Sequence, residues 1–148
     1  IASSPTLNSL LVMWEAADFH DCVFSHYVVQ WRPAASSAAW RVPSGCAALT
    51  SPCEVQCTAG GLPSNAQAVF RVSVACASSS ASSAASTVSS PVATQPVPSA
   101  APTGVAVTNI ASTSAHVSWT AAALNDCTFV RWSVVVTDVA NGQPVTPQ

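Results

Sequence analysis

The chain has 148 residues, of which 49% are hydrophobic and only 7% are charged, and its net charge is −2 at pH 7. Its four basic residues are all arginines, which excludes the dense positive surface that a nucleic-acid partner requires and leaves no polybasic patch for an anionic membrane. No apolar run approaches the roughly 20 residues of a membrane-spanning helix, so we expect no direct insertion of this chain into a membrane.

The predicted elements are short β-strands separated by turns rich in Gly, Pro, Ser and Ala. Residues 27–32 alternate clearly, with Tyr27, Val29 and Trp31 on one face, and Pro33 ends the strand. Residues 67–76 form the longest predicted strand. The remaining predicted strands are residues 1–4, 7–14, 40–42, 53–58, 87–94, 104–108, 114–119 and 129–137. Residues 95–102 contain three prolines and predict a stiff, extended connection.

A sequence repeat relates the two ends of the chain. Residues 14–17 (WEAA), 21–24 (DCVF) and 27–29 (YVV) return without a gap as residues 119–122 (WTAA), 126–129 (DCTF) and 132–134 (WSV), an offset of 119 − 14 = 105 residues. A repeat of this period in short β-segments predicts small sandwich domains in tandem. We therefore predict a first unit over residues 1–97, which lacks most of its first strand, and a second unit over residues 98–148, which is the N-terminal half of a domain.

The motifs of this chain resemble those of fibronectin type III domains. Residues 102–107 (PTGVAV) and 114–119 (SAHVSW) resemble the opening of such a domain. Residues 27–33 with 40–42 are similar to its central hairpin, and residues 62–72 resemble the turn into its sixth strand. The resemblance covers essentially the whole chain. It implies an all-β fold of immunoglobulin-like β-sandwiches of the fibronectin type III type in tandem, with the second one truncated.

The same resemblance places a set of apolar side chains in the core. The predicted core residues are Trp14, Tyr27, Val29, Trp31, Leu62, Phe70, Val72, Trp119 and Trp132. One departure concerns Ala68, which stands where the family usually has the tyrosine whose hydroxyl bonds back to the backbone at this corner. We expect disulfide cross-links to supply part of the stability that the missing tyrosine would give.

The disulfide candidates are the six cysteines of the chain, Cys22, Cys46, Cys53, Cys57, Cys76 and Cys127. Five of them fall in the first unit, and this density in a small β-domain predicts disulfides formed in an oxidising compartment. Buried free thiols are one alternative, and a zinc site at the Cys53-x3-Cys57 spacing is another.

The fibronectin type III resemblance implies a Cys22–Cys76 bond, with Cys46 paired to Cys53 or to Cys57. Cys53 and Cys57 would not pair with each other within one extended strand, because four strand residues span about 13 Å. Cys127 occupies the repeat position of Cys22, so its partner would lie past Gln148. A bond between Cys127 and the odd cysteine of the first unit is the rival pairing.

One group of side chains carries potential chemistry, namely His20, Asp21 and Cys22 with His26. The matching stretch of the repeat keeps Asp126 and Cys127 but has no histidine, which favours a structural Asp-Cys loop over a metal site or nucleophile. The sequence contains no phosphate-binding loop, no G-x-S-x-G elbow and no H-E-x-x-H motif. We therefore expect a protein that is not an enzyme, with no cofactor and no metal.

Two surface features have competing interpretations. Trp31, Trp40 and Arg71 either serve packing, with Trp31 in the core and Trp40 covering a sheet edge, or form an aromatic platform for sugars. Residues 78–103, rich in Ser, Thr and Pro, either carry O-linked glycans or form an unmodified loop and linker.

Together these features predict a non-catalytic structural and adhesion repeat module. It would belong to a long secreted or cell-surface glycoprotein, of the kind found on flagellar surfaces or in cell walls, and would act as a rigid spacer and assembly surface. Its expected partners are other protein chains or further repeats of the same protein, and its expected location is extracellular or on the cell surface. The alternatives are a spacer module of a secreted carbohydrate-active enzyme and a ligand-binding receptor ectodomain.

Overall fold

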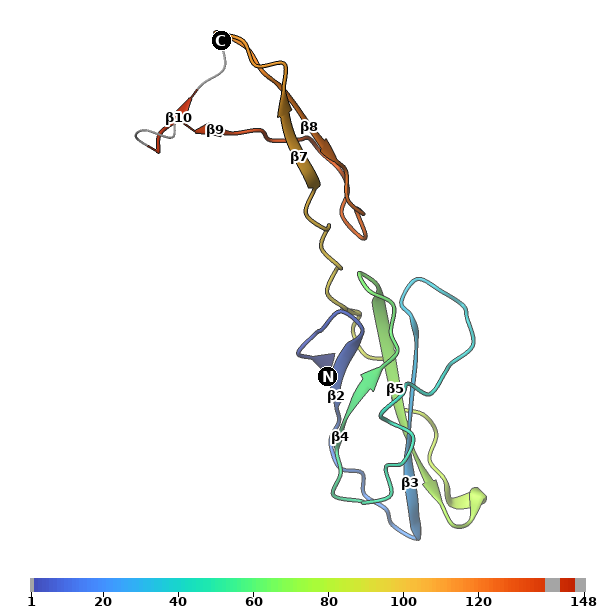
Figure 1. Ribbon diagram of the computed structural model, residues 1–148. Helices are drawn as coiled ribbons and strands as arrows, with labels where there is room; N and C mark the ends of the chain where they lie inside the picture. The colour runs from blue at the N-terminus through green and yellow to red at the C-terminus, as the bar shows by residue number, and fades with distance from the viewer. Residues whose placement is uncertain (1, 138–141, 146–148) are drawn as a thin grey trace.

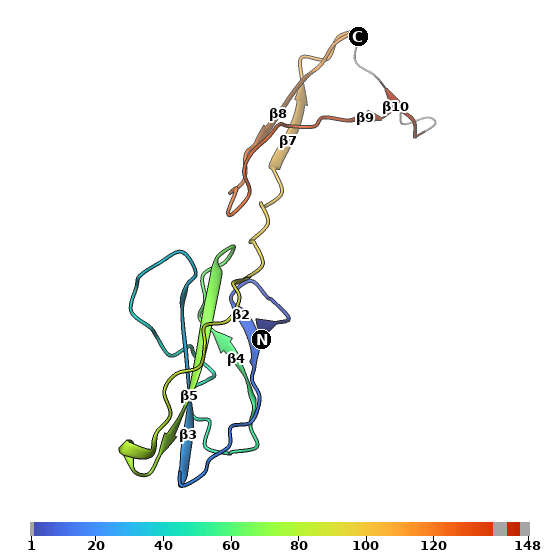
Figure 2. The ribbon, with the colours of Figure 1, turned by 180° about the vertical axis from the view of Figure 1, so that it is seen from behind.

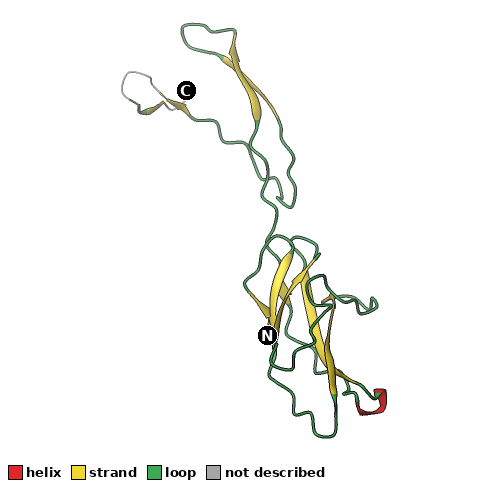
Figure 3. Cartoon of the chain, turned by 60° about the horizontal axis from the view of Figure 1, so that its bottom comes forward, coloured by secondary structure: helices red, strands yellow, loops and turns green. Residues whose placement is uncertain are grey.

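The computed structural model describes residues 2–137 and 142–145, and its regular structure is almost entirely β (Figure 3). The only helical element in these residues is one turn of 3-10 helix, η1 (Ser79–Ala81). No helix in the described part of the chain is long and apolar enough to span a bilayer. The strands are β1 (Ala2–Ser3), β2 (Ser9–Met13), β3 (Phe24–Pro33), β4 (Gln56–Gly60), β5 (Gln67–Cys76), β6 (Val92–Ala93), β7 (Thr103–Thr108), β8 (His116–Thr120), β9 (Val136–Thr137) and β10 (Pro144–Val145).

Two antiparallel three-stranded sheets face each other in the first unit. One has the strand order β1-β2-β4 and the other β3-β5-β6. The long strands β3 and β5 run side by side over almost their whole length (Figures 1 and 2). Tyr27, Val29 and Trp31 alternate along β3 and turn toward the opposite sheet, with exposed fractions of 2%, 0% and 8%. The apolar residues that alternate with a period of two in the sequence therefore form the face of β3 that is buried in the core.

The predicted core residues differ in how deeply they lie. Leu62 and Phe70 are buried together with the three β3 residues, while Trp14 and Val72 are partly buried and pack against the same cluster. Trp119 is partly buried and Trp132 is 45% exposed. The prediction of Trp132 as a core residue is wrong for the described chain, because no second sheet packs over it as β2 and β4 pack over its repeat equivalent Tyr27.

Several predicted strands are shorter than expected, each for a local reason. Residues 40–42 form a single bridge, in which Arg41 pairs with Trp31. β4 begins only at Gln56, because Cys53 lies in a turn, and it extends to Gly60. Of residues 129–137, only Val136–Thr137 is a strand, since the described chain offers residues 129–135 no neighbouring strand to pair with.

The last predicted strand of the first unit, residues 87–94, is replaced by a different arrangement along the edge of β5. Ser83, Ser86 and Ser89, which we call the serine ladder, bond to Val74, Val72 and Phe70 in that order. Each serine N–H donates to the strand carbonyl, at 3.0, 2.7 and 2.9 Å. Each serine Oγ accepts the N–H of the same strand residue, at 2.9, 3.0 and 3.0 Å.

The hydroxyl hydrogens of the serine ladder are bonded within the same segment. Each serine hydroxyl donates to the carbonyl of the next residue, namely Ala84, Thr87 and Ser90. From one ladder serine to the next the chain uses three residues, while the facing residues of β5 are two apart, a distance of about 6.6 Å. Three residues of an extended strand would span more than this. The segment is therefore coiled, and hydroxyl oxygens take the place that backbone carbonyls would hold in a sheet. Regular pairing resumes only at β6, where Val92 and Ala93 pair with the start of β5.

A buried hydroxyl holds the corner where the family has a tyrosine. Thr94 is 3% exposed, and its Oγ1 donates to the Pro63 carbonyl at 2.6 Å and accepts the Ala66 N–H at 3.2 Å. Ala68 is itself buried and has no group that could make these bonds. Thr94, the residue directly after β6, therefore fixes the turn into β5 by side-chain hydrogen bonds.

The second unit repeats the local geometry of the first at the same offset of 105 residues. Ala2 pairs with Val12 in β1–β2, and Val107 pairs with Val117 in β7–β8. The edge-to-face ring pair of Trp14 and Tyr27, with centroids 5.2 Å apart, is matched by Trp119 and Trp132 at 5.4 Å. β9 and β10 pair with each other as a separate short ladder. The two units lie end to end, joined by the segment before β7 (Figures 1 and 2).

Candidate functional site

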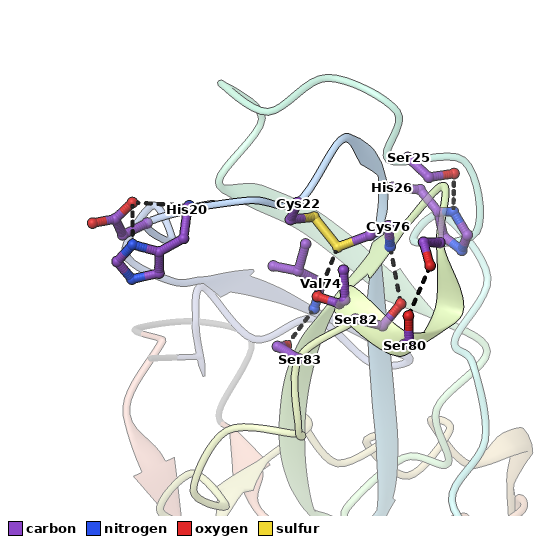
Figure 4. The surroundings of a disulfide bond; sticks show 12 residues. His20, Cys22, Ser25, His26, Val74, Cys76, Ser80, Ser82 and Ser83 are labelled. Atoms are coloured by element: carbon purple, nitrogen blue, oxygen red, sulfur yellow. Dashed lines mark hydrogen bonds and ion pairs between the residues drawn. A yellow bond between two sulfur atoms is a disulfide. The ribbon is translucent and has the colours of Figure 1, made fainter.

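Two disulfides close the first unit. Cys22–Cys76 joins the loop between β2 and β3 to the end of β5, with a Cα–Cα distance of 5.5 Å and a sequence separation of 54 (Figure 4). Cys46–Cys57 ties the loop after β3 to β4, with a separation of 11. Of the two partners that the resemblance left open for Cys46, the structure therefore uses Cys57.

The remaining two cysteines, Cys53 and Cys127, are free and exposed. Cys53 lies in the turn before β4, and Cys127 lies in the loop after β8. They are not bonded to each other, so the rival pairing of Cys127 with the odd cysteine of the first unit is absent from the structure.

The two histidines near Cys22 contact other side chains, and the Cys22 sulfur is bonded to Cys76. In Figure 4, His20 and His26 lie on opposite sides of the Cys22–Cys76 bond. His20 Nδ1 is 3.7 Å from the Asp18 carboxylate, and His26 Nδ1 is 3.1 Å from the Ser25 hydroxyl. The sulfur that would serve as nucleophile or metal ligand is consumed by the disulfide. Among the described residues, no group of three or more His, Cys, Asp or Glu side chains is placed to hold a metal ion.

The aromatic residues near the β3–β5 edge serve packing. Trp31 is buried, and the Trp40 ring carries the guanidinium groups of Arg71 and Arg32, whose carbons lie 4.3 and 4.7 Å from its centroid. Arg71 is held in place by Gln30, whose side-chain oxygen accepts its Nε and Nη2 at 2.9 and 2.8 Å. Such stacking contributes about 0.5–1 kcal/mol at an exposed site. These contacts occupy the indole surface that a sugar platform would need.

A hollow of about 620 Å³ lies between the end of β2 and the serine ladder. Trp14, Tyr27 and Val72 line it on one side, and residues 83–87 line it on the other. Its ionisable side chains are Glu15 and Tyr27, and the Tyr27 hydroxyl already donates to the Pro52 carbonyl at 3.1 Å. Its lining therefore contains one carboxylate and one phenol, and the phenol is already hydrogen-bonded.

Polar contacts link the two units at what we call the joint. The Val97 N–H donates to Asp126 Oδ2 at 2.8 Å, and the Asp126 N–H donates back to the Val97 carbonyl at 3.2 Å. Asn125 Nδ2 donates to the Pro98 carbonyl at 2.7 Å. The Ala100 N–H donates to the Ala123 carbonyl at 3.0 Å. Four hydrogen bonds thus hold the linker against the loop that follows β8.

The same linker is fixed to the first unit at its other end. The Gln95 N–H donates to the Thr6 carbonyl at 2.8 Å, and the Gln95 carbonyl accepts the Asn65 N–H at 3.2 Å. Only Pro96 separates this anchor from Val97, and its ring restricts the backbone between the two anchors. The linker is therefore bonded on both sides over a few residues, which restricts rotation of one unit about the other.

The electrostatics of the joint concentrate on one carboxylate. The backbone N–H of Val97, followed by the Ser64 hydroxyl, holds the pKa of Asp126 below its ordinary value, against the smaller opposing effect of desolvation. Ser64 belongs to the turn before β5, so Asp126 interacts with both the linker and the body of the first unit. The ionised carboxylate is the form that these donors stabilise.

Comparison with solved structures identifies the architecture. The crystal structure of the FN1–FN3 domains of chicken CNTN1, a contactin, is similar to this chain. The match covers 81% of this chain, with a TM-score of 0.57 and 14% sequence identity. The fold is that of fibronectin type III β-sandwiches. This chain spans 39% of the length of that contactin chain. No protein-family model matches the chain, and no curated protein matches it by sequence.

Two features of the structure were missed by the sequence interpretation, although each left a signal. The serine ladder is visible as Ser83, Ser86 and Ser89 at a spacing of three directly after the longest strand. The joint is visible as an Asp-Cys pair that the repeat keeps at residues 21–22 and 126–127, while the residue before it changes from His20 to Asn125. Hydrophobic periodicity, the main signal for strands, detects neither feature because both depend on polar groups.

Proposed function

We propose that this chain is part of a non-catalytic repeat module of a long secreted or cell-surface glycoprotein, in which tandem fibronectin type III domains serve as rigid spacers and assembly surfaces. The fold supports a non-catalytic module in general, and the similar contactin domains belong to a cell-adhesion protein. Two disulfides in the first unit are consistent with folding in an oxidising compartment outside the cytosol.

The joint is the single observation that carries the spacer role. A flexible tether between domains has few bonds to either side, whereas this linker is bonded to the first unit at Gln95 and to the second unit at Val97, Pro98 and Ala100. A linker of this kind transmits the orientation of one domain to the next. The proposed mechanism is therefore mechanical: each module sets the position and the angle of its neighbour.

The rigidity of the joint is tested by ¹⁵N relaxation and residual dipolar couplings on the full 148-residue chain. A rigid joint gives one alignment tensor for the first unit and the β7–β8 hairpin, and one set of rotational correlation times. Two independent tensors, with fast internal motion at residues 96–100, would contradict the spacer role. The variant Asp126→Ala should show two independent tensors and faster motion at residues 96–100. The variant Asp18→Ala, in a loop of the first unit, should keep the single tensor of the wild type.

We further propose O-linked glycans on the exposed serine and threonine hydroxyls of residues 78–103. Thr87 and Ser90 are exposed, and their hydroxyls have no hydrogen-bond partner in the described chain. Ser83, Ser86 and Ser89 each use their hydroxyl both as acceptor and as donor, and Thr94 is buried. A glycan on any of these four would break the edge of β5 or the corner before it. Peptide mass spectrometry of protein from its natural source should find hexoses on Thr87 or Ser90 and none on the ladder.

A further inference from the structure

The repeat places a second copy of the joint loop at the opposite end of the first unit. In the second unit, Asn125 has a positive φ of 50°, and the Cys127 N–H closes the turn on the Leu124 carbonyl at 2.9 Å. In the first unit, His20 has a positive φ of 43°, and the Cys22 N–H closes the equivalent turn on the Phe19 carbonyl at 2.7 Å. The two loops therefore have the same backbone turn at an offset of 105 residues.

Asp21 occupies in this turn the position that Asp126 occupies in the joint. Asp126 is bonded to the Val97 N–H, whereas the Asp21 side chain is exposed and has no hydrogen-bond or ion-pair partner among the described residues. The other aspartate of this loop, Asp18, is not kept in the repeat, where Ala123 stands at its position. Within this loop the repeat thus retains the one carboxylate that the joint uses.

We propose that the loop around Asp21 is a docking surface for the linker end of another copy of this module, joined upstream in the same orientation. The inference rests on the proposed function and adds the partner and the contact. The occupied joint shows the chemistry of the partner: a free backbone N–H at the position of Val97, a carbonyl that accepts the Asp N–H, and a hydroxyl at the position of Ser64. The first unit presents all of these groups at its other end.

A regular assembly follows from this placement. If the same carboxylate makes the same bonds at every boundary, each module is rotated and shifted relative to its neighbour by the same amount. Identical steps of this kind generate a straight or helical rod whose pitch is set by one joint. The module would then have one donor end, with Ser64 and Val97, and one acceptor end, with the Asp loop.

The inference is tested with a lengthened chain in which residues 1–105 are duplicated directly in front of Ile1, which preserves the repeat register because Ile1 corresponds to Ala106. Amide hydrogen exchange is read at the Val97 of the added copy. With Asp21 intact we expect this amide to be protected as strongly as Val97 of the natural joint. Asp21→Ala in the middle module should reduce that protection about tenfold or more, as expected for loss of a hydrogen bond to a charged group. Glu15→Ala is the matched control, because Glu15 is an exposed carboxylate of the same loop without a side-chain partner among the described residues, and it should leave the protection unchanged.

Two results separate the inference from the function on which it rests. An added Val97 amide that is unprotected with Asp21 intact, or whose protection is unchanged by Asp21→Ala, overturns the inference while the natural joint at Asp126 still supports a rigid spacer. Loss of order at the natural joint of the wild-type chain overturns the spacer function itself. In the chain of 148 residues, Asp126→Ala should remove protection at Val97 and Asp21→Ala should not.

Discussion

Replacing the hydroxyls of the serine ladder should destabilise the first unit in a graded way. Each of Ser83, Ser86 and Ser89 accepts a strand N–H through its Oγ and donates to the next carbonyl of its own segment. A change to alanine leaves the backbone N–H bond of the ladder residue intact, and it removes the hydroxyl oxygen that accepts the facing strand N–H. The cost then depends on whether water can reach that N–H.

Burial of the facing strand residue decides the magnitude at each rung. Phe70, opposite Ser89, is 2% exposed, so its N–H would be left without an acceptor, at a cost of about 1–3 kcal/mol. Val72, opposite Ser86, is partly exposed, so water can replace the hydroxyl and the cost falls to about 0.5–1.5 kcal/mol. We expect Ser89→Ala to be the more harmful change. The triple variant should lose about 3–5 kcal/mol. This is a large share of the free energy of unfolding of a domain, which is typically about 5–15 kcal/mol.

The measurement is equilibrium urea unfolding followed through resolved NMR resonances of the first unit. Thr87→Ala is the matched control, because Thr87 lies in the same segment and its hydroxyl bonds to nothing in the described chain. Ser89→Thr keeps the hydroxyl and should retain most of the stability. If Ser89→Ala is no more destabilising than Thr87→Ala, the hydroxyls do not act as sheet acceptors and the reasoning is refuted.

Three further predictions concern the corner, the disulfides and the joint. Thr94→Val should cost about 1–3 kcal/mol in urea unfolding, because it leaves the Ala66 N–H and the Pro63 carbonyl without the hydroxyl, and Thr94→Ser should recover most of it. Replacing both cysteines of the Cys22–Cys76 bond by alanine should cost about 4 kcal/mol of stability, and the same change at Cys46–Cys57 about 3 kcal/mol, because the first bond closes the longer loop. Thermal unfolding of the two double variants measures the losses, and equal losses would contradict this ordering. Because the pKa of Asp126 in the joint is lowered, the bond to Val97 should be fully present above the ordinary value of 3.8 and should be lost as the pH falls below it, which a pH titration of the Val97 amide shift will show.

The strands that bury a face are the part of the fold that the sequence predicts best. The longest predicted strand, residues 67–76, coincides with β5, and the alternation of Tyr27, Val29 and Trp31 marks the buried face of β3. In both cases the signal is the placement of apolar side chains at every second position, and the core selects for it directly. The residues that end β3 and β4, Pro33 and Gly60, are likewise visible because they restrict or free the backbone.

The edges and the joint could not be predicted in the same way. Ser83, Ser86 and Ser89 bond to β5 through hydroxyls at every third residue, a spacing that neither the strand period nor the helix period describes. Trp132 occupies a core position by repeat and by resemblance, yet it is exposed because burial depends on sheets that come from elsewhere in the sequence. The contact between Asp126 and Val97 joins residues 29 positions apart across a proline-rich linker, and only the folded backbone brings them together.

The placement of the serine ladder also explains why contacts between modules belong at the ends of the sandwich. A free strand edge presents unpaired N–H and C=O groups and invites sideways pairing with another chain. Here the outer edge of β5 is used by Ser83, Ser86 and Ser89, and the coiled segment that carries them does not have the backbone spacing to accept a further strand. On the other sheet, the end of β4 is covered where the Gly60 N–H donates to the Ser44 carbonyl. With these two edges restricted and few charged residues in the chain, directional contact between modules is favoured at the loops at the two ends, where Asp126 makes the bond to the linker and Asp21 holds the same position.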